Sequence, residues 1–244
     1  MRVVGDYHMH TKKSDGRATS LEMIRAAVTK GLKTIAITDH GPNNIGTGVK
    51  DERVFLETKK ELERLQQDFP DIKLLVGAEA DIISVDGQID ISKEVIKELD
   101  VLIVGFHPYI WPASLQDAWS LVAKNLVAKS FPNFSSSLKE QNTRTLLKAL
   151  ERYPVDIVSH PNLGFPINVG EVAKACAEKG VLFEINTGHA YISLEDVIEA
   201  ASQGVNFIIN SDAHFAESVG KGDFGINILK QAQVPVERIV NVEP

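Results

Sequence analysis

Residues 155–186 read VDIVSH, PNLGFPIN, VGEVAKACAEK, G and VLFEIN. The apolar runs Val155–Ser159 and Val181–Ile185 lack strict alternation, which is typical of parallel strands that are covered on both faces. Between them, Val169–Lys179 has a helical period, begins after the N-cap candidate Asn168 and ends at Gly180. This stretch therefore predicts a strand, a helix and a second strand, the repeating unit of α/β proteins.

The same alternation runs through most of the chain. Apolar runs predict five further strands, over Val3–His8, Thr34–Thr38, Lys73–Gly77, Val101–Gly105 and Val205–Asn210. Segments of helical period that end near Gly or Pro predict four further helices, over Ser20–Lys30, Arg53–Phe69, Ser193–Gln203 and Phe224–Gln233. Because no linker rich in Pro, Gly or Ser divides these elements, we predict one α/β domain over 1–244. A seven-stranded βα barrel is the favoured fold, and a doubly wound open sheet is the alternative.

Two segments interrupt this pattern. We interpret Gly41–Asp51, which has three Gly, one Pro and two Asn, as a mobile loop. Pro108–Ser137 is longer and is rich in aromatic residues, namely Tyr109, Trp111, Trp119, Phe131 and Phe134. We interpret it as an extra helix with a small core of its own, and a lid or an oligomer contact is the alternative.

Composition limits the class of protein. The chain has 244 residues, and its 26 Lys and Arg against 33 Asp and Glu give a formal charge of −7. A chain of this length buries roughly 70 to 75% of the surface that its unfolded form exposes, so a metal would be functional rather than structural. The acidic balance without basic runs disfavours a nucleic-acid partner, and no apolar stretch reaches the roughly 18 residues of a membrane span.

The single cysteine, Cys176, excludes a disulfide framework, and we interpret it as a small residue that packs in a helix. The first residues contain no apolar signal core. We therefore expect a cytoplasmic protein.

Six of the seven histidines lie at or just beyond the C-terminal end of a predicted strand: His8, His10, His40, His107, His160 and His214. In a parallel barrel these ends converge on one rim, where barrel enzymes build their sites. Side chains at positions i and i+2 of a strand point to the same side. His8 and His10 can therefore face one common pocket, and so can Asp212 and His214. Neutral imidazoles with a few carboxylates favour zinc, manganese or iron over calcium or magnesium. The rim therefore predicts a transition-metal site.

Six motifs follow one another at strand-sized intervals: His8-Met9-His10, Thr38-Asp39-His40, Gly77-Ala78-Glu79, Gly105-Phe106-His107, Ser159-His160-Pro161 and Ser211-Asp212-Ala213-His214. Their order resembles that of the PHP (polymerase and histidinol phosphatase) superfamily, and most closely its small stand-alone phosphatases. The resemblance implies a distorted seven-stranded (β/α)7 TIM-like barrel with a trinuclear metal centre.

The resemblance also implies how three divalent transition-metal ions (Zn, Mn or Fe) are held. One ion would take His8, His10, Glu79 and Asp212, and a second would share Glu79 with His107 and His160. The third would take Asp15, His40 and His214. Part of the family has a His one position after Asp15, so this chain would use the carboxylate version.

The charges of this set favour an anionic substrate. Three divalent ions bring +6 and the three carboxylates return −3, which leaves about +3 in the cleft. Such ions polarise a phosphoryl oxygen and lower the pKa of bound water from about 15.7 towards about 7. We therefore predict a metal-dependent phosphoester hydrolase that acts on a small phosphomonoester through metal-bound hydroxide. Asp212 or a histidine near the leaving group, such as His214, would transfer protons.

Other residues near the rim are candidates for supporting roles. Asn186 and His189 are predicted substrate contacts, although Asn186 would equally hold the loop that follows it and His189 would equally be an exposed loop residue. Arg17 and Lys12 on rim loops are candidate anion clamps. Asp6 is expected either to orient His8 or His10 or to form a simple ion pair.

Three alternative functions remain from the sequence. An amidohydrolase that cleaves a non-phosphate bond would use similar ligands, but such sites usually enlist a strand-end Lys, and none of the seven predicted strand ends carries one. A nuclease or phosphodiesterase fits the superfamily, although the chain has no basic stripe. A protein that only binds or senses metal is the non-catalytic alternative.

Overall fold

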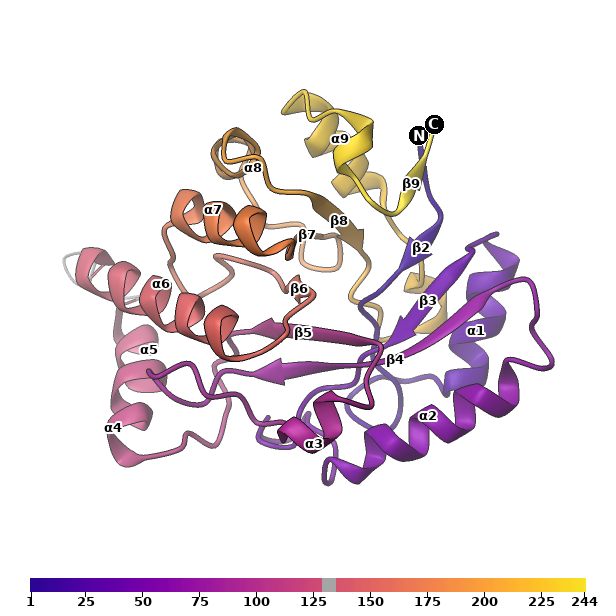
Figure 1. Ribbon diagram of the computed structural model, residues 1–244, viewed down its shortest axis with the longest axis horizontal. Coiled ribbons are helices and arrows are strands. Elements are labelled where there is room, and N and C mark those ends of the chain that lie inside the picture. Colours follow the sequence, from indigo (N-terminus) through magenta and orange to yellow (C-terminus); the bar gives the residue numbers. More distant parts are fainter. Residues whose placement is uncertain (129–134) are drawn as a thin grey trace.

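The computed structural model describes residues 1–128 and 135–244. Seven parallel strands pair with one another in chain order: β2 (Gly5–Asp6), β3 (Thr34–Ile37), β4 (Lys73–Asp81), β5 (Val101–Gly105), β6 (Ile157–Val158), β7 (Leu182–Asn186) and β8 (Phe207–Asn210). The strands curve into a nearly closed barrel with helices around its outside (Figure 1). The predicted seven-stranded barrel is confirmed, and the doubly wound alternative is wrong.

The longer helices connect successive strands: α1 (Ser20–Thr29), α2 (Arg53–Leu65), α6 (Ser135–Arg152), α7 (Val169–Lys179), α8 (Leu194–Ser202) and α9 (Asp223–Gln231). Local sequence signals set their ends. Thr19 and Glu22 form a reciprocal capping box at the start of α1. Helix α7 begins after the Asn168 cap and ends at Gly180, whose φ of 72° suits a residue without a Cβ atom.

The two edge strands of the barrel sheet, β2 and β8, are joined by two sets of hydrogen bonds that the sequence did not predict. Beyond β2 and β8, Met9 pairs with Ala213, and the His10 backbone N–H donates to the Ala213 carbonyl at 2.9 Å. At the other end of the barrel, the buried Asn241 amide donates to the carbonyls of Gly5 (2.7 Å) and Ile209 (2.6 Å). An antiparallel pair, β1 (Arg2–Val3) with β9 (Val242–Glu243), adjoins this end.

The inward face of the barrel changes from apolar to polar along the strands. Ala36, Leu75, Ile103 and Ile208 belong to one buried apolar cluster near the strand starts. Because side chains alternate along a strand, Glu79 and Asp81 lie on the same face of β4 as Leu75. The side chains of β7 and β8 alternate between the two faces in the same way. The outward residues pack under the helices in larger clusters, so the strands are covered on both faces and do not alternate.

Several predicted bounds differ from the structure. Strand β4 extends to Asp81, so Glu79 lies within the strand rather than beyond its end. Helix α2 ends at Leu65 instead of Phe69, because the Gln66 side chain donates to the carbonyls of Phe69 and Ile72 and holds a turn there. No element was predicted over 138–152, where most of α6 lies, nor for the short helix α3 (Lys93–Ile96).

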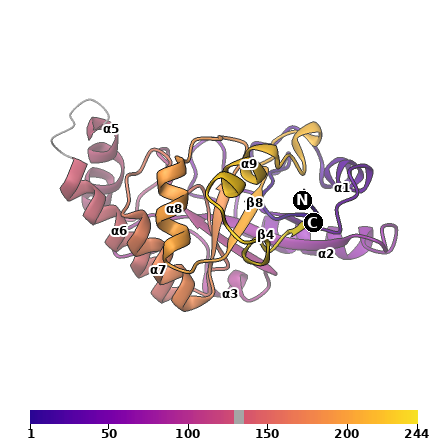
Figure 2. The same cartoon turned by 90° about the horizontal axis from the view of Figure 1, so that it is seen from above.

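The segment Pro108–Ser137 is mostly helical where the structure describes it. It contains α4 (Leu115–Asp117), a π-helix (Ala118–Ala123), α5 (Lys124–Ala128) and the start of α6, while Phe131 and Phe134 lie outside the described residues. Figure 2 shows α5 and α6 at one end of the molecule, with α1 and α2 towards the other. The expected small core is wrong for Tyr109, Trp111 and Trp119, whose side chains are exposed. The loop Gly41–Asp51 is tied to this segment, since Ile45 donates to the Tyr109 carbonyl.

Candidate metal centre

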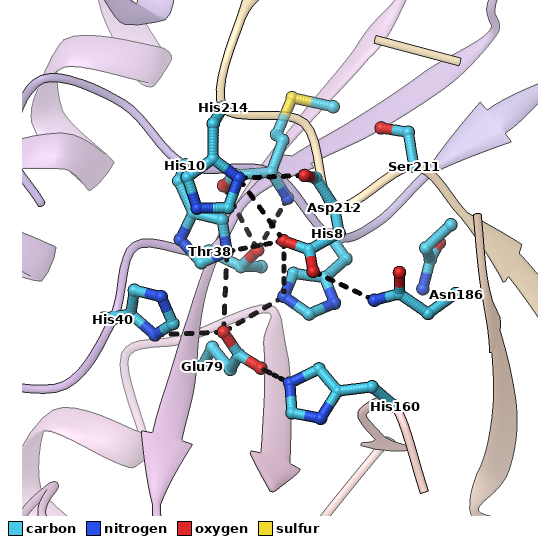
Figure 3. A network of polar contacts seen from close by, with 12 residues as sticks. His8, His10, Thr38, His40, Glu79, His160, Asn186, Ser211, Asp212 and His214 are labelled. Carbon is cyan, nitrogen blue, oxygen red and sulfur yellow. Dashed lines mark hydrogen bonds and ion pairs between the residues drawn. The ribbon is translucent and has the colours of Figure 1, made fainter. Parts of the chain in front are cut away.

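All nine predicted metal ligands meet at the carboxyl ends of the strands. Figure 3 labels them, apart from Asp15 and His107. His8 and His10 follow β2, His40 follows β3, His107 follows β5 and His160 follows β6. Asp212 and His214 follow β8, Glu79 projects from β4, and Asp15 lies on the loop before α1. Residues that are as much as 206 positions apart in sequence, such as His8 and His214, therefore share one site because a parallel barrel gathers all its strand ends on one rim.

The Glu79 carboxylate is buried at the middle of this site and faces two groups of histidines. Its Oε2 atom lies 3.0–3.4 Å from one ring nitrogen each of His8, His10 and His40. Its Oε1 atom lies 2.8 Å from His160 Nε2 and 3.4 Å from His107 Nε2. A single side chain thus connects the two groups, as expected for a bridging carboxylate.

A third group lies on the other side of His10. The ligand atoms of His10, Asp15, His40 and His214 all fall within 4.8 Å of one another. Asp15 Oδ2 lies 3.2 Å from His214 Nε2 and 3.9 Å from His40 Nε2. His10 belongs to two groups, because its Nε2 atom also lies 3.2 Å from Asp212 Oδ1, whereas the resemblance assigned it to one ion only.

Five buried polar atoms of the cluster have no hydrogen-bond partner: His8 Nε2, His10 Nδ1, His10 Nε2, Asp15 Oδ1 and Glu79 Oε2. Leaving such an atom unsatisfied costs about 1–3 kcal/mol, so several of them together require a partner from outside the chain. Imidazole nitrogens and carboxylate oxygens are the donors that divalent transition metals prefer. The side chains present therefore fit such ions.

Neighbouring acids and carbonyls orient the histidines. The Glu184 carboxylate accepts from His8 Nδ1 at 2.7 Å and from the His160 backbone N–H at 2.7 Å. Asp81 accepts from His107 Nδ1, and the Asp212 carbonyl accepts from His214 Nδ1 at 2.9 Å. Each Nδ1 atom is thereby assigned as the donor, so that in the neutral ring the Nε2 lone pair points into the cluster.

The roles of Glu184 and Asp81 were missed from the sequence. The period of two along the strands, from Glu79 to Asp81 and from Leu182 to Glu184, is the signal that points to them.

Burial and charge act in opposite directions within the metal-free site. Burial alone would lower the pKa of His8, but the charges of Glu79, Glu184 and Asp212 outweigh it and hold that pKa well above its ordinary value. Burial likewise opposes protonation of His214, but the hydrogen bond to Asp15 and the nearby Asp212 raise its pKa to about 9. In contrast, burial and the neighbouring His40 lower the pKa of His10 to about 4.

Two of these side chains stand on backbone of left-handed conformation. His160 has φ of 28° and Asp212 has φ of 50°, a region that residues other than Gly rarely adopt. Asn162 and Ala190, on the loops beside them, also have positive φ. The backbone that presents this part of the site is therefore strained.

The supporting residues differ more from expectation. The Asp6 carboxylate makes no hydrogen bond to the imidazole ring of His8 or His10. It accepts from the Ser211 backbone N–H (3.1 Å) and from Gly220 (2.7 Å) and so holds the chain before Asp212. Asn186 is fully buried and does not line the cavity. Its amide nitrogen donates to Asp212 Oδ2 at 3.0 Å, and its amide oxygen accepts from the His189 backbone N–H, so it holds the following loop.

The predicted anion clamps do not reach the site. Lys12 Nζ lies 3.8 Å from a carboxylate oxygen of Glu22, and neither Lys12 nor Arg17 is among the described residues that line the cavity. His189 does line it, with Nε2 3.4 Å from Asp212 Oδ2 and half of its side chain exposed.

The site opens into a cavity of about 430 Å³, within the usual range of about 300–1,000 Å³ for small-molecule sites. Candidate ligands, among them Asp15, Glu79, Asp212 and His214, form its floor. Aromatic and aliphatic side chains from the segment 106–126 and from 163–165 form its wall. No helix in the described parts of the chain is long and apolar enough to cross a membrane.

A parallel barrel with a histidine and carboxylate cluster on its carboxyl rim defines a class of metal-dependent barrel proteins. The chain belongs to the PHP domain family, whose model matches residues 6–160. It is 31% identical to a "Probable phosphatase" of Shewanella pealeana, over 100% of this chain and 90% of that protein. A "Probable phosphatase" of Caldanaerobacter subterraneus subsp. tengcongensis is also 31% identical, over 99% of this chain and 88% of that protein.

Among solved structures, the histidinol phosphate phosphatase of Lactococcus lactis in complex with zinc, L-histidinol and phosphate has a similar fold. The TM-score is 0.62 at 16% identity, with 95% of this chain and 94% of that chain covered. The family expected from the motifs is therefore confirmed.

Proposed function

We propose that the protein is a phosphoric ester hydrolase that cleaves a small phosphomonoester with the help of three divalent transition-metal ions. One observation carries the proposal: nine histidine and carboxylate side chains form one cluster with several unsatisfied buried atoms, and seven of them line an open cavity. A site that only stored metal would need no such opening. The "Probable phosphatase" relatives and the zinc and phosphate in the histidinol phosphate phosphatase complex support the same reaction.

We assign the ions to three neighbouring sets of side chains. Glu79 Oε1 with His107 and His160 would hold one ion, and Glu79 Oε2 with His8, His10 and Asp212 a second. Asp15, His40 and His214, with His10 close by, would hold the third. Bound zinc, manganese or iron would supply Lewis acidity for the phosphoryl group and make water acidic at neutral pH.

The protein's own groups then position and move protons. Asn186 holds Asp212 Oδ2, so that Oδ1 faces the cluster and is the proposed acceptor of a proton from the attacking water. Asp212 would then pass that proton to the leaving group, while His214, which lines the cavity, would hold the third ion through Nε2. The Asp212 carbonyl fixes the ring of His214 for this role through Nδ1.

The test combines elemental analysis of the purified protein with hydrolysis of p-nitrophenyl phosphate before and after treatment with a chelator. We expect bound transition metal, loss of turnover on chelation and recovery when zinc or manganese returns. Asp212→Asn should abolish turnover while circular dichroism shows an intact fold.

Four results would contradict the proposal. Turnover that survives complete metal removal would exclude the metal-dependent mechanism. Hydrolysis of amides or lactones without any phosphoester hydrolysis would favour the amidohydrolase alternative, and cleavage of oligonucleotides alone would favour the nuclease. Metal binding without any turnover would leave a metal-binding protein.

A further inference from the structure

We propose that the organic part of the substrate is apolar and uncharged, so that the enzyme removes a single phosphate from an aromatic or aliphatic alcohol. The inference rests on the proposed function and narrows it. It comes from the wall of the cavity, which has a different chemistry from the floor.

The wall consists of large apolar side chains that come from two connections: Phe106, Pro108, Tyr109, Val122, Leu126, Leu163 and Phe165. Phe106 and Phe165 stack with ring centroids 5.1 Å apart, which joins the two connections into one surface. Tyr109 is 66% exposed and Leu126 is 43% exposed. Apolar side chains that line a cavity next to a reactive site are typical of the surface that covers an apolar ligand group.

The seven side chains that form this wall also carry no charge. Among the described residues that line the cavity, every carboxylate belongs to the candidate metal ligands and none is Lys or Arg. The polar groups that remain, apart from His189 and the Tyr109 hydroxyl, belong to Asn44, Thr47 and Asn125.

These three polar side chains already have partners within the protein. Asn125 donates to the Leu121 carbonyl at 2.8 Å and exchanges hydrogen bonds with Asn142. Asn44 lies 3.3 Å from Asp81 Oδ1 and accepts from the Thr47 hydroxyl.

A charged leaving group would therefore lose its hydration without gaining a partner. The ammonium group of an amino alcohol phosphate would meet no free acid on the wall, and a second phosphate would meet no base. Burial of an unpaired charge is strongly unfavourable, whereas burial of an apolar group on this wall is favourable. The cavity should thus select against polyphosphates, nucleotides and cationic esters.

Two esters of nearly equal shape test this inference: 2-cyclohexylethyl phosphate and 2-(piperidin-1-yl)ethyl phosphate, whose ring nitrogen is protonated at pH 7. With the metal-loaded protein we expect kcat/KM to be about 30-fold or more higher for the cyclohexyl ester. The corresponding phosphonates should follow the same order of affinity in titration calorimetry, which does not depend on turnover.

Leu126→Asp places a carboxylate on the wall and should reverse the preference, by lowering kcat/KM for the cyclohexyl ester and raising it for the piperidinium ester. Leu115→Asp is the matched control, because Leu115 is 92% exposed in the same segment and does not line the cavity. If Leu126→Asp does not fold, as judged by circular dichroism, Tyr109→Ser provides a second wall variant that should weaken the preference.

Equal kcat/KM for the two esters, or a preference for the cation, would overturn the inference while leaving the phosphatase proposal intact. The same holds if the protein cleaves p-nitrophenyl phosphate but neither ester. If no phosphoester is cleaved, the proposed function fails, and the calorimetric order of the two phosphonates still decides whether the wall selects apolar groups.

Discussion

The floor and the wall of the cavity are made by different parts of the chain and under different constraints. The floor comes from the ends of the barrel strands, where the hydrogen-bonded sheet fixes each side chain to within a narrow range of positions. The wall comes from the segment 106–126 and from 163–165, which are connections between strands. Because connections tolerate change far better than strands, we expect the barrel to constrain the proposed reaction and the connections to select its substrate.

The largest expected effect is at the middle of the floor. Glu79→Gln removes the one carboxylate that faces both histidine groups, so we expect loss of bound metal and a fall in kcat of about 10³-fold or more for every phosphoester. Elemental analysis and steady-state kinetics measure both. The exposed Glu140→Gln, which removes only a surface contact with Arg144, serves as the control. Normal metal content in folded Glu79→Gln would exclude the bridging role.

A smaller loss, of metal affinity alone, is expected at Glu184, which contacts His8 and His160 from behind the floor. Glu184→Gln leaves every candidate ligand in place but weakens the hold on His8 and on the His160 backbone, so metal affinity should fall about 10- to 100-fold. Competition with a chelator of known affinity gives this value. A positioning role further predicts that kcat is restored at saturating metal, and a permanent loss of kcat would contradict it.

Protons should compete with metal ions for the histidines of the floor. In the metal-free protein the pKa of His8 is well above its ordinary value and that of His214 is about 9, so both are protonated at neutral pH. Metal binding needs neutral imidazoles and must expel these protons, so affinity should fall by about tenfold per pH unit for each proton displaced as pH decreases from 8 to 6. Zinc titrations with a pH indicator measure the release. Metal binding without proton release would refute these protonation states.

The smallest effect is expected at the cations nearest the rim. Lys12 is more than half exposed and lies beside Glu22, and Arg17 does not reach the cavity. Lys12→Ala and Arg17→Ala should therefore change kcat/KM by no more than about twofold, because exposed charges are screened by solvent and salt. A larger change in phosphate inhibition would show that one of them reaches the substrate.

The floor was predictable from the sequence and the wall was not, and the reason is geometric. A histidine at the end of an apolar strand has its position fixed by the barrel, so six motifs contained eight of the nine side chains, and the ninth, Asp15, followed from the family resemblance. No strand fixes the positions of the wall residues in this way. The aromatic residues of Pro108–Ser137 identify an unusual segment, but nothing in their spacing separates Tyr109, which lines the cavity, from Trp111, which does not.

Side-chain amides were the least predictable feature of the fold. Asn241 lies between β2 and β8 and satisfies backbone groups of both, and its position follows only from the closed barrel. Asn186 and Asp6 were predicted near the site, but their partners depend on backbone N–H groups that a sequence pattern does not locate. The positions of residues on a strand are thus predictable from the sequence, whereas the contacts between connecting segments are not.

The positive φ angles of His160 and Asp212 have a consequence for thermal stability. Each such conformation costs on the order of 1–3 kcal/mol, and glycine would avoid most of that cost. In the metal-free protein, His160→Gly should therefore melt at a higher temperature than His160→Ala, although both variants lack the ligand. At these two residues, the backbone conformation that presents a candidate ligand is thus one that lowers thermal stability.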